Sequence, residues 1–243
     1  MSNDATVSYE EEIDHILIWL DRTIGEPGAY IHLKGAFSSS SDPKHALPVK
    51  LIDSDYDKIL RNSGPVEVNF DGVQFLLAAF TEIEPCIECF KNFQHKRIFF
   101  IVSGSLGRTA VPQIFEACPN AFNDPLTDEK YESIYVYCHN TQYQADWICD
   151  YIGYIQIFTH DGDLLARMLR DIGNYFVMIG KRLLEDDPLD YEAAYHRLSW
   201  AHELYQRHCK LQGVSLKPEF EELNELIQNA EDGIKDAQSD ADD

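Results

Sequence analysis

Four short runs of apolar, β-forming residues place the strongest constraint on the fold of this chain. They are HILIWL, RIFFIV, SIYVYC and YIQIF, at residues 15–20, 97–102, 133–138 and 154–158. Apolar residues at consecutive positions are typical of strands that are buried on both faces of a parallel sheet. Helical patterns follow the last three runs, at about residues 111–117, at 141–151 and from 163 onward. This alternation predicts right-handed crossovers and a doubly wound, mostly parallel α/β sheet.

Between the first two runs, the sequence predicts an insertion and then a hairpin. Residues 25–65 are rich in Gly, Ser and Pro, which indicates an insertion outside the core of the sheet. Two strand patterns, Val66–Phe70 and Val73–Phe80, then flank an Asp-Gly pair, which is the usual signature of a β-hairpin. Pro85 begins a predicted helix that ends near Asn92.

The last third of the chain has a helical pattern. Apolar residues recur at helical spacing from Leu164 onward, a second helix is expected between Asp187-Pro188 and Gly213, and Pro218 begins a third. The apolar stripe of the third helix suits either capping of the first two helices or contact with another chain, and we expect capping. The domains expected are an α/β domain, a helical extension and an acidic tail, at residues 1–162, 163–238 and 239–243.

Composition argues against several classes of partner. The formal charge of −22 disfavours nucleic acid and anionic membrane surfaces, which attract clustered Lys and Arg. No apolar run reaches the roughly 18 residues that span a bilayer, and the first residues do not have the pattern of a secretory signal. Six cysteines in 243 residues do not indicate a disulfide scaffold. We therefore expect a reduced, cytoplasmic protein that binds neither nucleic acid nor membranes.

Polar residues follow the predicted strands at the edge where open α/β sheets bind ligands. Asp21, His139 and His160 lie at three of these strand ends. The remaining strand continues into a glycine-rich segment that contains the candidate residues Ser103, Gly104, Ser105, Gly107, Arg108 and Thr109. Backbone N–H groups at the start of a helix, with one guanidinium, would suit a phosphate or carboxylate. Alternatively, the glycines only permit a tight turn, and Arg108 is a surface charge.

The segments LIWLD, RIFFIVSGSLGRTAVPQI, SIYVYCHN and IQIFTHDGDLL resemble a receiver-like α/β module of some invertebrate multidomain proteins. In that family the module often precedes a mono-ADP-ribosyltransferase domain or tetratricopeptide repeats. The resemblance covers residues 13–165 and implies a flavodoxin- or receiver-like strand order. Asp21 matches the first-strand acid of a receiver, whereas Ser103-Gly104 occupies the position of the phosphate-accepting Asp and Thr159-His160 that of the usual Lys. It therefore implies a pseudo-receiver without phosphorelay activity.

Two further resemblances are more local. Residues 165–208 resemble one tetratricopeptide repeat, which cannot bury its apolar face alone and must pack on the α/β domain, the last helix or a partner. The segment VSGSLGRTA resembles the loop of tyrosine phosphatases, with Arg108 and Thr109 in register. Val102 stands in the position of the nucleophile, so the resemblance implies anion binding without turnover.

The remaining motifs favour structural roles. Cys86 and Cys89 have the spacing of a thioredoxin-type pair, but they share one apolar helix face with Phe90 and Phe93. We expect buried core thiols. The spacing of Cys and His in the chain does not match a zinc site, so we expect neither a metal nor a cofactor.

Two hypotheses for function follow from the sequence. In the first, the chain is a non-catalytic adaptor that binds a protein partner, or itself, through its C-terminal helices. In the second, it binds or hydrolyses a phosphorylated small molecule or nucleotide at the carboxyl edge of the sheet.

Overall fold

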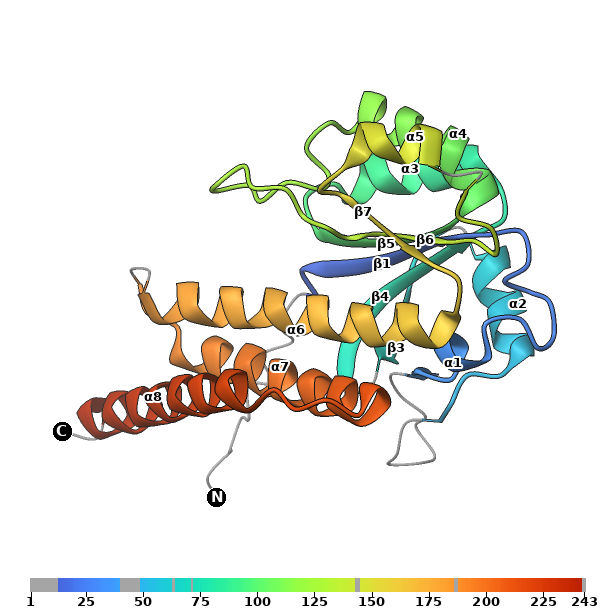
Figure 1. Ribbon diagram of the computed structural model, residues 1–243. Coiled ribbons are helices and arrows are strands. Elements are labelled where there is room, and N and C mark those ends of the chain that lie inside the picture. The colour runs from blue at the N-terminus through green and yellow to red at the C-terminus, as the bar shows by residue number, and fades with distance from the viewer. Residues whose placement is uncertain are drawn as a thin grey trace, which may run out of the picture.

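The computed structural model describes residues 13–39, 49–62, 64–70, 72–142, 145–185 and 188–241. In these residues, a seven-stranded sheet has the order β2-β3-β4-β1-β5-β6-β7. Helices cover both faces of the sheet, and two more helices form an additional layer beyond one face (Figure 1). The predicted α/β class, with a mostly parallel sheet and a C-terminal helical extension, is confirmed.

Five neighbouring strands are parallel and form the centre of the sheet. They are β4 (Val73–Phe80), β1 (His15–Leu20), β5 (Arg97–Ser103), β6 (Ile134–Tyr137) and β7 (Ile155–Phe158). The four apolar runs are therefore adjacent parallel strands, as predicted. The strands β3 (Val66–Phe70) and β2 (Phe37–Ser39) extend the β4 edge in antiparallel orientation. The β3–β4 pair confirms the predicted hairpin, of which Asp71 lies outside the described residues.

Burial on both faces explains why β1 is apolar at consecutive positions. Ile16 and Ile18 pack on one face, which α3 (Ile83–Phe93), α4 (Gly104–Ala117), α5 (Ala145–Ile148) and the 3₁₀ turn η1 (Cys149–Tyr151) cover. Leu17 and Trp19 pack on the other face, which α1 (Ile31–Lys34), α2 (Asp53–Arg61) and α6 (Asp161–Glu185) cover. The predicted insertion at 25–65 therefore supplies α1 and α2 to the second face and β2 to the edge of the sheet.

The chain connections diverge at β1. After β1, the chain passes through α1, β2, α2 and β3 and returns as β4 on one side of β1. It then crosses through α3 to β5 on the other side, and continues outward to β6 and β7. Ligands of open α/β sheets bind where strand order reverses, outside the carboxyl ends of the strands. In this fold that position lies between β1 and β5.

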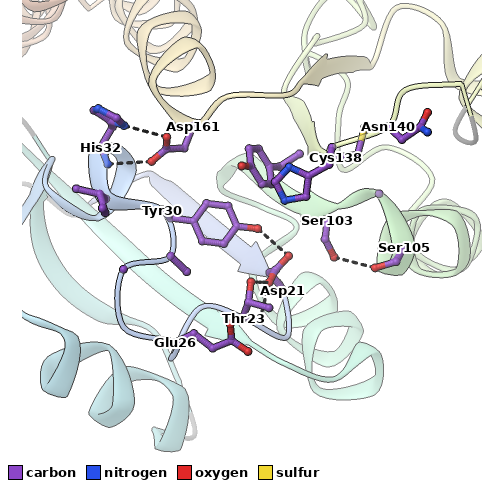
Figure 2. Close-up of a pocket in the computed structure, with 16 residues that line it drawn as sticks. Asp21, Thr23, Glu26, Tyr30, His32, Ser103, Ser105, Cys138, Asn140 and Asp161 are labelled. Carbon is purple, nitrogen blue, oxygen red and sulfur yellow. Dashed lines mark hydrogen bonds and ion pairs between the residues drawn. The ribbon is translucent and has the colours of Figure 1, made fainter.

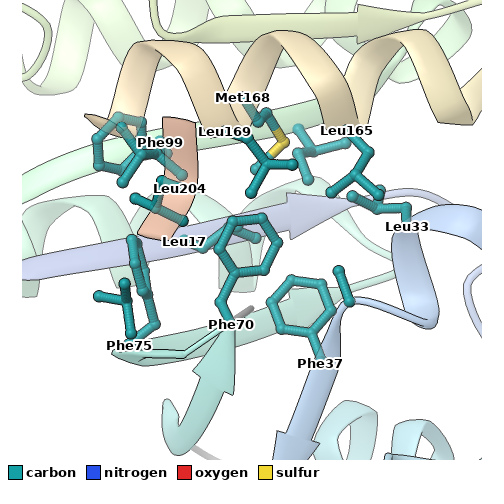
Figure 3. Packing of buried hydrophobic residues seen from close by; sticks show 14 of the residues in the cluster. Leu17, Leu33, Phe37, Phe70, Phe75, Phe99, Leu165, Met168, Leu169 and Leu204 are labelled. Atoms are coloured by element: carbon teal, nitrogen blue, oxygen red, sulfur yellow. The ribbon is translucent and has the colours of Figure 1, made fainter. Parts of the chain in front are cut away.

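The helical extension packs on the same core as the sheet. Helix α7 (Tyr191–Gln212) lies along α6, and α8 (Lys217–Ala241) lies along α7. Figure 3 shows Leu204 of α7 in the same apolar cluster as Leu17 of β1 and Leu169 of α6. Leu223 of α8 is 1% exposed and belongs to this cluster, so the expected capping by the last helix is what the structure shows.

Close approach of α6 and α7 depends on two glycines. A Cβ atom at Gly173 would lie 2.6 Å from the Tyr205 ring, and a Cβ atom at Gly180 would lie 2.6 Å from Leu198. Helix α7 ends at Gly213, which has a φ of 64°, as predicted. Its predicted start at Asp187-Pro188 was wrong, because the side chain of Asp190 caps it by accepting from the N–H of Ala193.

Candidate functional site

A cleft of about 640 Å³ opens at the carboxyl ends of β1, β5 and β6, which is the position that the strand order indicates. Figure 2 shows the side chains that face it. Its lining residues come from the segments that follow these strands, from α1 and from the first residue of α6: Asp21, Thr23, Glu26, Gly28, Ala29, Tyr30, Ile31, His32, Ser103, Gly104, Ser105, Tyr137, Cys138, His139, Asn140 and Asp161.

Asp21 follows β1 directly and is 4% exposed. Thr23 donates its backbone N–H and its hydroxyl to Oδ1 of Asp21, at 2.6 and 2.5 Å, and the Tyr30 hydroxyl donates to Oδ2 at 2.8 Å. Burial, and then the charge of Asp21, raise the pKa of Tyr30 well above its usual value, so its hydroxyl remains protonated. The carboxylate of Asp21 is therefore satisfied by its own chain.

Tyr30 is positioned by an uncommon backbone conformation. Its φ is 56°, in the left-handed region that bulky residues rarely adopt. Its ring packs edge-on against Trp19 and Tyr137, with ring centroids 5.0 and 4.9 Å apart. The hydrogen bond to Asp21 and these two rings together hold Tyr30 between the two sides of the cleft (Figure 2).

Asp161, the first residue of α6, joins this helix to α1. It accepts hydrogen bonds from the backbone N–H and the Nδ1 of His32, at 2.8 and 2.9 Å. Burial tends to raise the pKa of Asp161, but the hydrogen bonds from His32 outweigh it and hold the pKa below its usual value. Asp161 and His32 thus form the side of the cleft opposite Ser103 and Ser105 (Figure 2).

The glycine-rich segment after β5 is the start of a helix, whereas the sequence predicted a helix only from about residue 111. Helix α4 begins at Gly104, directly after its N-cap Ser103, whose side chain makes no capping hydrogen bond. Ser103 and Ser105 line the cleft with their hydroxyl oxygens 3.4 Å apart. The signal for a helix was present in the sequence, because the buried side of α4 repeats at helical spacing: Leu106, Ala110, Val111 and Ile114.

The other candidate residues of this segment lie outside the cleft lining. Gly107 is buried under Trp147, whose ring would lie 3.0 Å from a Cβ atom at this position, so its role is close packing within a helix. Arg108 and Thr109 are exposed on α4. The approach of the Arg108 guanidinium to the first N–H groups of the helix stays a prediction.

The two candidate histidines are placed differently. His139 follows β6 and lines the cleft, whereas His160 is exposed and does not. Sequence reasoning missed Tyr30 and Glu26, because they fall in the segment predicted as an insertion. It also missed Asn140, although its position next to a strand end was a usable signal.

The cleft is acidic on balance. Its described lining includes Asp21, Glu26 and Asp161 and contains neither Lys nor Arg. The start of α4 provides partial positive charge at the cleft, because the first backbone N–H groups of a helix have no partner within it. In the described part of the chain, His, Cys, Asp and Glu side chains do not gather in a group of three or more that could hold a metal ion.

The CxxC pair lies in α3, away from the cleft. Cys86 and Cys89 are 0% and 7% exposed in the core beneath this helix. Burial raises the pKa of both thiols, to about 12 for Cys89, which is the opposite of the shift that activates a redox cysteine. These properties support the interpretation of the pair as core residues.

Among the described residues, no helix combines the length and the apolar character that crossing a bilayer requires. Comparison of the chain with protein-family models, curated proteins and solved structures finds no match in any of the three.

Proposed function

We propose that this protein is a non-catalytic recognition module, built on a degenerate receiver-like domain and acting in the cytoplasm. The parallel strands have the order β4-β1-β5-β6-β7, which is 2-1-3-4-5 when these five are numbered along the chain, and this supports a flavodoxin-like arrangement. The observation that carries the proposal is the geometry of Asp21, the first-strand acid. Its two oxygens receive three hydrogen bonds from Thr23 and Tyr30, so it acts as a structural anchor.

The residue in the acceptor position also lacks what phosphoryl transfer needs. Ser103 has a hydroxyl in place of a carboxylate, and its hydrogen-bonding neighbour is the hydroxyl of Ser105. A serine is a weak nucleophile without an adjacent base, and a hydroxyl is not one. The same argument weighs against a hydrolase that would use Ser103.

The surface available to a protein partner is acidic. The apolar side of α8 packs on α7, and its outer side exposes carboxylates such as Glu225 and Asp236. We expect a partner with a basic face, or a basic region of a second copy, whose binding weakens as salt screens these charges. Charge reversal by Glu225→Lys and Asp236→Lys should abolish this binding, whereas Asp150→Lys, an exposed acid of η1, should not.

A magnesium titration tests the non-catalytic proposal. In a working receiver, the first-strand acid binds Mg²⁺, and the amide signals of its neighbours shift saturably. Here we expect the amide signals of Asp21, Thr23 and Ser103 to remain unshifted at millimolar Mg²⁺ in ¹H–¹⁵N spectra. A saturable shift of these signals that is lost in Asp21→Asn would overturn the proposal.

A second candidate function is binding of a nucleotide or another phosphorylated small molecule in the cleft. The two sides of the cleft suit different parts of a nucleotide. The start of α4, beside Ser103 and Ser105, suits a phosphate, and carboxylates such as Asp161 on the opposite side can accept hydrogen bonds from ribose hydroxyls. Tyr30 and Tyr137 also line the cleft, and their rings contact each other edge-on.

Thermal unfolding with added ligand tests this second function. A ligand at 100 times its dissociation constant stabilises the folded state by about 2.7 kcal/mol. We expect stabilisation by AMP that is reduced in the double variant Ser103→Ala and Ser105→Ala. Thr109→Ala, which removes an exposed hydroxyl from the same helix, is the matched control and should respond as the unmodified protein does. Absence of stabilisation by AMP, ATP and inorganic phosphate would exclude this candidate.

A further inference from the structure

The first residue of β1 is a histidine in the core whose two ring nitrogens both face acceptors. His15 is 0% exposed. Its Nδ1 lies 2.7 Å from Oδ1 of Asp14, and its Nε2 lies 2.6 Å from the backbone carbonyl oxygen of Gln74 on β4. Carbonyl and carboxylate oxygens only accept, so each nitrogen must donate a proton. A neutral imidazole has one N–H and can satisfy one of these contacts, whereas an imidazolium satisfies both.

The alternative, a neutral His15 beside a protonated Asp14, is disfavoured by the surroundings of Asp14. Burial tends to raise the pKa of Asp14, but the hydrogen bond from His15 and then the charge of Arg197 outweigh it and leave the pKa below its usual value. Nη2 of Arg197, on α7, lies 3.2 Å from Oδ2 of Asp14. The Asp14 side chain is also 42% exposed, so its charge is partly hydrated. The shared proton therefore belongs on His15.

Several further groups around His15 are aromatic or positively charged. Its ring is in edge contact with rings from β4, α6 and α7, at centroid distances of 4.2, 5.1 and 6.1 Å: Phe75, Phe176 and Trp200. Arg97 is its register partner on β5, and the Arg97 guanidinium stacks on Tyr131, with Cζ 3.2 Å from the ring centroid. On α6, burial raises the pKa of Tyr175 well above its usual value, so that phenol is neutral. Of these described neighbours, Asp14 alone carries a negative charge that can balance a charged His15.

We propose that His15 is a buried imidazolium and that, together with Arg197, it holds Asp14 between β1 and α7. Asp14 accepts from His15 on β1 and from Arg197 on α7 at the same time. If His15 loses its proton, a lone pair faces either Asp14 or the carbonyl of Gln74, and that contact must open. Leu198 and Leu204 also hold α7 in the core, so the charged contacts of Asp14 add to apolar packing of the same helix.

NMR of the imidazole nitrogens tests the charge directly. In protein labelled with ¹⁵N-histidine, we expect both nitrogens of His15 to be protonated at pH 7.5, because each lies against an acceptor. Asp14→Asn is the matched variant, because its amide can donate to Nδ1 and satisfy a neutral ring that keeps its Nε2–H. His15 should then lose one proton at the same pH. One unprotonated His15 nitrogen in the unmodified protein, or an unchanged signature in Asp14→Asn, would overturn the assignment.

Amide exchange tests whether Asp14 links β1 to α7. In Asp14→Asn the contact with Arg197 loses its negative charge, so the protection of α7 amides near Arg197 should fall about tenfold relative to α3, the size expected for one broken buried hydrogen bond. Equal protection in both proteins would show that Asp14 does not contribute to the docking of α7.

Discussion

Replacement of Asp21 by Asn tests whether this residue has a structural or a functional role. The variant should be less stable if Asp21 is a structural anchor, and equally or more stable if Asp21 is a functional acid. In a working acidic site, carboxylates repel one another, and neutralising one commonly stabilises the fold at the expense of function. Here the carboxylate of Asp21 accepts two hydrogen bonds from Thr23 and one from Tyr30. An amide keeps one acceptor oxygen and presents an NH₂ group where the second oxygen was. At least one buried donor must then turn away or remain without a partner.

The size of this effect follows from the loss of one charge-assisted hydrogen bond and the weakening of the others. We expect Asp21→Asn to lower the free energy of unfolding by about 2 kcal/mol. In a chain of this size, that corresponds to a fall of about 4–8 °C in Tm. Urea and thermal unfolding, followed by circular dichroism, measure both quantities.

Glu26→Gln is the matched control for this experiment. Glu26 lines the same cleft, but it is exposed, so its neutralisation should change the free energy of unfolding by no more than about 0.5 kcal/mol. Unchanged or increased stability of Asp21→Asn would refute the structural role of Asp21, and with it the main argument for a degenerate site.

Three further predictions concern the rest of the molecule. Asp124 accepts hydrogen bonds from a tyrosine hydroxyl, two backbone N–H groups and an arginine of α6, and these hold its pKa far below its usual value. The free energy of unfolding should therefore decrease as the pH falls below about 4. Unfolding measured against pH should show a smaller decrease in Asp124→Asn. Gly180→Ala places a Cβ atom 2.6 Å from a leucine of α7, and it should lower the free energy of unfolding in urea by about 1–2 kcal/mol. Gly162→Ala, whose Cβ atom would lie 3.7 Å from its nearest neighbour, should not lower it. Equal effects of the two variants would contradict the close packing of α6 and α7. Iodoacetamide should label the exposed Cys149 in the native protein and the buried Cys86 only after unfolding, as peptide mass spectrometry would detect, and native labelling or oxidation of Cys86 would restore the redox hypothesis.

The sheet was predictable because strands that are buried on both faces have apolar residues at consecutive positions. A strand such as β1 must be apolar at Ile16, Leu17 and Ile18 alike, since neighbouring residues face opposite layers of helices. The order of the strands also located the cleft edge, and Asp21, Ser103 and His139 do meet there.

The parts that escaped prediction depend on contacts between distant residues. Glycines such as Gly104 and Gly107 are typical of loops, but both lie in α4. Gly107 leaves space there for the Trp147 ring. Tyr30 enters the cleft because a left-handed backbone and the carboxylate of Asp21 fix it, and local composition carries neither signal. The charge of His15 likewise depends on Gln74, which lies on another strand.

The most direct test of the proposed absence of phosphoryl chemistry is the intact mass of the protein after incubation with acetyl phosphate and Mg²⁺. The carboxylate of Asp21 already accepts hydrogen bonds from Thr23 and Tyr30, and the acceptor position holds Ser103 in place of Asp. We therefore predict an unchanged mass. A stoichiometric phosphoryl adduct that disappears in Ser103→Ala or in Asp21→Asn would contradict this account.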